Sequence, residues 1–144
     1  MTSSAILDAG ADILRRRHRS GAGWYPGLDV DGDAVLLQEC CTCGYIRYPR
    51  AAYCPECLST DAVIRSVSGQ GTIWSFAVYH RAYDDAFADA VPYAVALVEL
   101  DEGPRLIGAV IDTPTDEVAI GRRVKAMPRE LEPGQYAVYF RVAS

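Results

Sequence analysis

The chain has 144 residues, 50% of them hydrophobic, and carries 14 Lys and Arg against 19 Asp and Glu for a formal net charge of −5. This length suits one compact domain, or one ordinary domain with a small appended module, and it suffices to bury a hydrophobic core. The acidic balance disfavours a protein that neutralises a nucleic-acid backbone, and no apolar run approaches the roughly 18 residues of a transmembrane helix.

The segment from Ser3 to Arg19 predicts an N-terminal helix, because apolar residues recur at helical spacing between a capping serine and two glycines. Basic residues follow its apolar stretch, which reverses the order found in signal peptides, so we expect a cytoplasmic protein that does not associate with membranes. One helix cannot bury its apolar stripe alone and must lie on the rest of the chain or on a partner. Trp24 and Tyr25 follow this helix and are our candidate anchors for docking on a partner.

Two Cys-x-x-Cys motifs stand between short apolar strands predicted at 35–38 and 63–67. The candidate metal ligands are Cys40, Cys43, Cys54 and Cys57. Two such turns can place four thiolates tetrahedrally around one ion, which is the arrangement of a structural zinc site. The sequence therefore predicts a zinc ribbon over residues 35–68. Cys41 lies between the ligands of the first motif and is expected to project away from the metal.

Other uses of the cysteines fit the sequence less well. A disulfide framework is disfavoured because the five cysteines are odd in number and a chain of this size can fold without disulfides. Neither motif has the strand and helix setting of a thioredoxin-like redox pair. Iron in a rubredoxin-like site remains the rival of zinc, because tetrahedral thiolates accept either metal. Zinc is favoured because nothing else in the sequence suggests electron transfer.

From residue 69 onward, apolar residues follow the alternating pattern of β-strands. The predicted strands are Thr72–Tyr79, Tyr93–Leu100, Arg105–Ile111, Arg122–Met127 and Tyr136–Arg141. A single helical turn at 115–118 separates the third strand from the fourth, and Gly108 indicates a bulge or a barrel corner. This pattern favours a mainly β chain whose residues 69–144 form a five-stranded OB-fold barrel. Residues 1–34 would form the N-terminal helical segment.

Two further expectations for the barrel region concern a turn and a pair of aromatic residues. Residues 128–134 are predicted as a turn between the last two strands, since they include Pro128 and Pro133. Trp74 and Phe76 alternate on the first strand and are expected to belong to the barrel core, because alternate positions of a barrel strand face inward.

An ordered set of motifs resembles domain-of-unknown-function family 35. These motifs are Leu37-Gln38-x-Cys40-x-x-Cys43-Gly44, Tyr48-Pro49-Arg50, Cys54-Pro55-x-Cys57, Gly71-Thr72-Ile73-x-Ser75, Val78-x-His80-Arg81 and Val98-Glu99-Leu100-Asp101-Glu102-Gly103. The resemblance implies an N-terminal helical segment, a rubredoxin-like zinc ribbon and an OB-fold. It also implies an acyl-CoA-associated accessory subunit of a thiolase-like enzyme, such as a ketothiolase, an acyltransferase or a retro-aldolase of steroid side-chain breakdown.

The sequence offers no catalytic machinery of its own. His18 and His80 are far apart, and no nucleophile elbow, phosphate-binding glycine loop or metallohydrolase motif is present. A four-thiolate site has no open position for water, so its metal is expected to stabilise the fold. Arg50, His80 and Arg81 are candidate contacts to acyl-CoA or to a partner. The alternative is that they belong to ordinary solvated loops.

The sequence therefore predicts a non-catalytic accessory subunit that binds zinc and a thiolase-like partner, with acyl-CoA as a possible ligand. The alternative is a single-stranded nucleic-acid binder, because zinc ribbons and OB barrels both serve that function and because Trp74, Phe76 and Tyr79 could stack on bases. A third hypothesis is that the protein is an iron-containing electron carrier.

Overall fold

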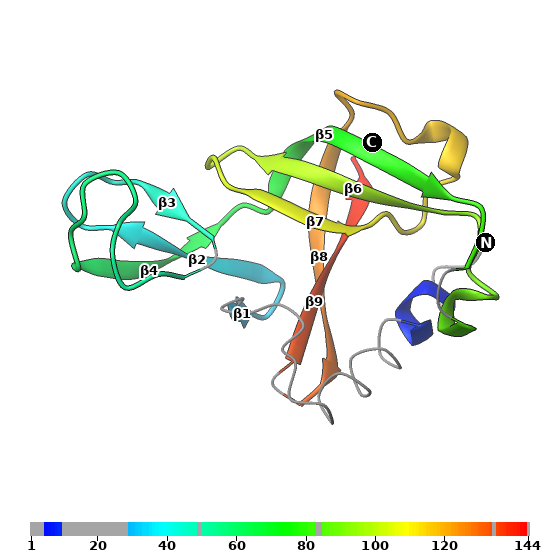
Figure 1. Ribbon diagram of the computed structural model, residues 1–144, viewed down its shortest axis with the longest axis horizontal. Helices are drawn as coiled ribbons and strands as arrows, with labels where there is room; N and C mark the ends of the chain where they lie inside the picture. Colours follow the sequence, from blue (N-terminus) through cyan, green and yellow to red (C-terminus); the bar gives the residue numbers. More distant parts are fainter. Residues whose placement is uncertain (1–4, 10–28, 49, 83–84, 134, 144) are drawn as a thin grey trace.

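The protein is mainly β in the computed structural model, which describes residues 5–9, 29–48, 50–82, 85–133 and 135–143 (Figure 1). The expected N-terminal helix is present as a turn of helix at residues 5–9. The rest of the segment predicted as helix, together with Trp24 and Tyr25, lies outside the described residues. Within the described part of the chain, no helix is long and apolar enough to cross a membrane.

The first sheet is built around one central strand. The four strands are β1 (Asp29–Asp31), β2 (Ala34–Cys40), β3 (Ile46–Arg47) and β4 (Ala62–Val67). All three neighbours pair antiparallel with β2, and β2 ends on the first candidate ligand, Cys40. The expected strands at 35–38 and 63–67 correspond to β2 and β4, whereas β1 and β3 are additions to the sequence-based prediction.

The second sheet is the predicted barrel. Its strands are β5 (Gln70–Tyr79), β6 (Tyr93–Leu100), β7 (Arg105–Ala109), β8 (Arg123–Glu132) and β9 (Gln135–Val142), in the order β7-β6-β5-β8-β9. A parallel bridge between Val110 and Phe140 brings the end of β7 beside β9. This order with a parallel closure is the Greek-key arrangement of an OB-fold, which confirms the predicted fold class. Two short 3₁₀ turns, η1 (Asp85–Phe87) and η2 (Thr115–Glu117), lie between strands.

Gly108 allows this closure. A Cβ atom built on Gly108 would lie 2.2 Å from the carbonyl oxygen of Val138 and 3.1 Å from Cε2 of Phe140. Any side chain at this position would therefore push β7 away from β9. The expected barrel corner is a point of close backbone approach.

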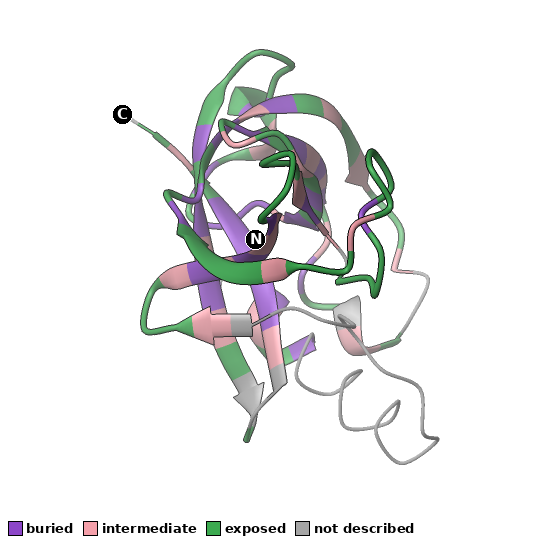
Figure 2. Cartoon of the chain, turned by 90° about the vertical axis from the view of Figure 1, so that its left-hand side faces the viewer, coloured by how far each residue is buried: buried purple, intermediate pink, exposed green. Residues whose placement is uncertain are grey.

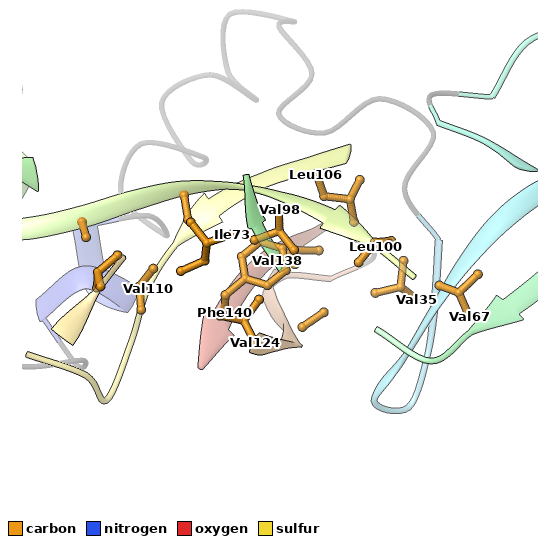
Figure 3. Close-up of a cluster of buried hydrophobic side chains, with 14 of the residues drawn as sticks. Val35, Val67, Ile73, Val98, Leu100, Leu106, Val110, Val124, Val138 and Phe140 are labelled. Carbon is orange, nitrogen blue, oxygen red and sulfur yellow. The ribbon is translucent and has the colours of Figure 1, made fainter. Parts of the chain in front are cut away.

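One hydrophobic core joins the two sheets. Phe140, Val98 and Ile73 lie at its centre in the barrel, and the same cluster includes Val35 and Val67 of the first sheet (Figure 3). Figure 2 shows buried residues concentrated on the barrel strands, whereas the loops of the first sheet are mostly exposed. The ribbon therefore packs on the barrel through its strands and leaves its cysteine-bearing loops at the surface.

A second cluster binds the N-terminal turn to the barrel. Ile6 is 1% exposed and belongs to a group of buried residues with Tyr93, Ile111 and Tyr139. The first turn of the predicted helix thus buries its apolar residues on its own chain. Figure 1 shows this turn beside η1, at the end of the molecule opposite the first sheet.

Two details of the predicted barrel were wrong. Trp74 and Phe76 are 50% and 36% exposed, so neither is buried in the core. Trp74 follows the buried Ile73 and is the extra residue of a β-bulge, which turns it to the outer face, whereas Phe76 pairs with buried Ala96 and lies on the inner face. The expected turn at 128–134 is also too long, since β8 continues to Glu132 and Pro128 pairs with Val138. β8 pairs with β5 only at residues 123–125, so from residue 126 onward the edge of β8 that faces away from β9 has no strand partner in the described part of the chain. Proline is tolerated at such a free edge because it has no N–H to donate.

Candidate metal centre

The two Cys-x-x-Cys turns bring four sulfur atoms together. The Sγ atoms of Cys40, Cys43, Cys54 and Cys57 all lie within 4.8 Å of one another. Two of the separations, Cys40 to Cys57 and Cys43 to Cys54, are 3.6 Å. A disulfide bond needs about 2.05 Å, whereas tetrahedral thiolates bound to zinc at about 2.3 Å stand about 3.8 Å apart. The four cysteines can therefore hold one metal ion.

The backbone around the sulfurs repeats the same turn twice. The N–H of Gly44 donates to the carbonyl of Cys40 at 3.0 Å, and the N–H of Leu58 donates to the carbonyl of Cys54 at 2.8 Å. Gly44 and Leu58 follow the second cysteine of their motifs and both have left-handed backbones, with φ of 79° and 64°. Glycine was expected in this role, whereas Leu58 adopts a conformation that is costly for a residue with a Cβ. The same turn at both motifs directs both pairs of sulfurs to a common point.

Amide groups prepare the sulfur of Cys40 for ionisation. The N–H of Thr42 points to Cys40 Sγ at 3.4 Å. The pKa of Cys40 is lowered to about 6, mainly because the backbone N–H of Cys43 donates to its sulfur, with a smaller contribution from Thr42. Burial opposes this shift. Hydrogen bonds to a thiolate stabilise its charge and so lower its pKa.

The neighbouring sulfur has the opposite preference. The backbone N–H of Tyr45 lowers the pKa of Cys43, but burial and the three other cysteines outweigh it and raise that pKa to about 12. Crowded sulfurs resist simultaneous ionisation unless a cation lies among them. The donor set thus fits a bound metal. Cys41 is exposed and is not among the four clustered sulfurs, as its place in the motif predicts.

The other candidate residues do not form one site. Arg50 is exposed on the loop between β3 and β4, whereas His80 and Arg81 are exposed just after the end of β5. Figure 1 shows the first sheet and the end of β5 at opposite ends of the molecule. Arg50 therefore cannot act on the same small group as His80 and Arg81.

A buried arginine beside this loop was not predicted from the sequence. Arg47 is 4% exposed, and its Nη2 donates to the carbonyl of Ala51 at 3.1 Å. The N–H of Ala51 in turn donates to Oε1 of Gln38 at 3.0 Å. Both contacts fix the loop that carries Arg50. The Nε and Nη1 atoms of Arg47 have no hydrogen-bond partner among the described residues. Arginine is usually exposed, so position alone could not predict this burial.

Comparisons with known proteins agree with this architecture. The family model described as "ChsH2, C-terminal OB-fold domain" matches residues 65–127. A "DUF35 domain-containing scaffold protein" of Methanocaldococcus jannaschii is 34% identical over 95 residues, which cover 65% of this chain and 67% of that protein. A "Probable enoyl-CoA hydratase alpha subunit" of Thermomonospora curvata is 32% identical over 126 residues, which cover 88% of this chain but only 38% of that protein.

A solved structure resembles most of the chain. It is described as "Ltp2-ChsH2(DUF35) aldolase", and its matching chain is 31% identical with a TM-score of 0.68. The match covers 80% of this chain and 98% of the other.

Proposed function

This chain belongs to the DUF35 family, and we propose that it is a non-catalytic accessory subunit of a thiolase-like enzyme that acts on acyl-CoA. The main support for this proposal is that our chain resembles 98% of the matching chain in the solved structure described as "Ltp2-ChsH2(DUF35) aldolase". The similarity to a hydratase alpha subunit is consistent with chemistry on CoA thioesters. We expect the reacting groups to lie in the partner subunit.

The metal centre supports a scaffolding role. Four thiolates complete a tetrahedral zinc shell, so no position remains where a metal could activate water or polarise a carbonyl. When bound, zinc would hold the loops of Cys40, Cys43, Cys54 and Cys57 and so order the surface of the ribbon. We propose zinc because all four donors are thiolates, with iron as the alternative.

Co-purification tests the proposed function. The tagged chain, purified from the cells that produce it in 0.5 M NaCl, should retain one thiolase-like subunit in constant stoichiometry, identified by mass spectrometry. Salt screens the long-range attraction that sustains binding to nucleic acid, whereas an apolar protein interface withstands it. Recovery of the chain alone, or with nucleic acid that salt removes, would contradict the proposal.

A single-stranded nucleic-acid binder is the second candidate. Its support is the exposure of Trp74 and Phe76, since exposed aromatic rings can stack on bases. The net charge of −5 opposes it, because such proteins track the phosphate backbone with a positive groove. Binding of a labelled oligonucleotide at 50 mM and 200 mM salt would separate the two candidates.

A further inference from the structure

A β-bulge places Trp74 on the outer face of the barrel. In the ladder between β5 and β6, Ile73 pairs with Val98 and Ser75 pairs with Leu97, so Trp74 is the extra residue. Bulges of this kind redirect a side chain. The guanidinium carbon of Arg105 lies 4.0 Å from the centre of the Trp74 ring. Because Arg105 is on β7 and Trp74 on β5, with β6 between them, the indole lies across the outer face of β6.

Apolar side chains adjoin the indole on this face. Ser75 pairs with Leu97, and Leu97 pairs with Ile107, so these residues form one row across β5, β6 and β7. Ile107 is 51% exposed and Leu97 is partly buried. We call Trp74, Leu97 and Ile107 the outer-face patch. Two half-exposed apolar side chains, those of Trp74 and Ile107, thus lie on one face of the sheet, and a partner that covered them would remove apolar surface from water.

Toward the N-terminal turn, residues of the protein itself pack on the outer face of β5, β6 and β7. The next row on these strands is Ala77, Val95 and Ala109. Val95 and Ala109 pack against the second cluster, to which Ile6 of the N-terminal turn belongs. On these strands the outer face therefore runs from a row partly covered by this cluster, through the outer-face patch, to the polar row of Thr72, Glu99 and Arg105.

The charges near the outer-face patch are paired within the chain. Arg105 lies 3.2 Å from a carboxylate oxygen of Glu99. Arg123 donates to both carboxylate oxygens of Asp101 at 2.7 Å, and this pairing lowers the pKa of Asp101. These pairs offer no net positive charge to a phosphate backbone. An apolar centre containing tryptophan, with a rim of balanced charges, is the composition of a protein interface.

We propose that the outer-face patch is a docking surface for the enzyme subunit, and that this subunit presents apolar side chains to Trp74 and Ile107. The inference rests on the proposed function for the identity of the occupant. The internal neutralisation of Arg105 and Arg123 favours an uncharged protein surface over a polyanion. The guanidinium of Arg105 lies over the indole ring and restricts its rotation, so less side-chain freedom is lost when a partner binds.

The test is the affinity of purified variants for the enzyme subunit recovered by co-purification, measured by biolayer interferometry with the full chain. Trp74→Ala should weaken binding about 30-fold, as expected for a central tryptophan. Ile107→Asp should weaken it at least as much, because it buries a charge in the interface. Val63→Ala is the matched control, since Val63 is a half-exposed apolar residue on β4, outside the two cysteine turns. It should change the affinity less than threefold. Unchanged metal content and melting temperature would show that the variants are folded.

Binding by the wild-type chain tests the proposed function, and binding by the patch variants tests the docking surface. If the wild-type chain recovers no enzyme subunit, the proposed function fails and the outer-face patch loses its occupant. If the wild-type chain binds the subunit and both patch variants bind equally well, only the docking surface is wrong. A wild-type dimer, detected by light scattering and lost in Trp74→Ala, would identify a second copy as the occupant and overturn the inference. Loss of oligonucleotide binding in Trp74→Ala would likewise overturn it in favour of nucleic acid.

Discussion

Replacing Gly108 with alanine should destabilise the barrel at the point where it closes. The added Cβ would lie 2.2 Å from the carbonyl oxygen of Val138 and 3.1 Å from the ring of Phe140. An ordinary contact of this kind is about 3.2 Å or more, so β7 and β9 must separate by about 1 Å. The parallel bridge from Val110 to Phe140 lies two residues further along each strand and would be strained by the separation.

The expected cost is about 3 kcal/mol, the upper part of the range for adding a methyl group to a packed interior. A change of 1 kcal/mol shifts the melting temperature of a domain of this size by about 4 °C, so we expect a decrease of about 12 °C. Gly32→Ala is a matched control, because no atom lies within 4 Å of its added Cβ and only its positive φ is unfavourable. That control should cost about 1 kcal/mol.

Thermal unfolding followed by circular dichroism measures both variants in the same buffer, with the metal content checked before each scan. A Gly108→Ala protein that melts within 2 °C of the wild type would refute the close approach of β7 and β9. Equal destabilisation of Gly108→Ala and Gly32→Ala would show that the contact with β9 costs no more than an unfavourable φ at an open position.

Three further predictions concern the metal, pH and the exposed candidates. Cys54→Ser should lose the metal and Cys41→Ser should keep one ion per chain by elemental analysis, because only the former removes one of the four clustered sulfurs; metal loss from Cys41→Ser would contradict the ligand assignment. Burial raises the pKa of Tyr139 to about 12. Its folded pKa exceeds the unfolded value of about 10, so its contribution to stability is complete below pH 10 and is lost as the pH rises toward 12. Tyr139→Phe should therefore move the alkaline unfolding midpoint upward, and an unchanged midpoint would show that this phenol does not limit stability. Arg50→Ala and the double variant His80→Ala with Arg81→Ala should each weaken acyl-CoA binding or partner turnover about tenfold if their loops contact the ligand phosphates. Unchanged values by calorimetry and steady-state assay would leave these residues as ordinary loop positions.

Local patterns predicted much of this fold. The cysteine spacing identified four residues whose sulfurs converge, because each Cys-x-x-Cys turn fixes its own geometry within a few residues. The alternation of apolar residues located the five barrel strands, and Gly108 marked the position where two strands meet. These features depend on neighbours in the sequence or on a requirement that only one residue type meets.

Other features depend on contacts that no local pattern encodes. Strict alternation placed Trp74 and Phe76 on one face, but Trp74 is an extra residue in β5, so it lies on the outer face while Phe76 pairs with buried Ala96 on the inner face. Pro128 suggested a turn, yet it lies in a strand whose free edge tolerates proline. The separation of Arg50 from His80 follows from the packing of the two sheets. The left-handed backbone of Leu58 is imposed by the cysteine turn against the preference of leucine.

The most direct test of the central claim is steady-state turnover of an acyl-CoA substrate by the separated and recombined subunits. We expect no turnover by this chain alone, because we place the reacting groups in its partner. The enzyme subunit alone should show low or unstable activity, which should recover when the zinc-loaded chain is added in equal amount. Turnover by the purified chain alone, or full and stable activity of the enzyme subunit without it, would contradict the claim.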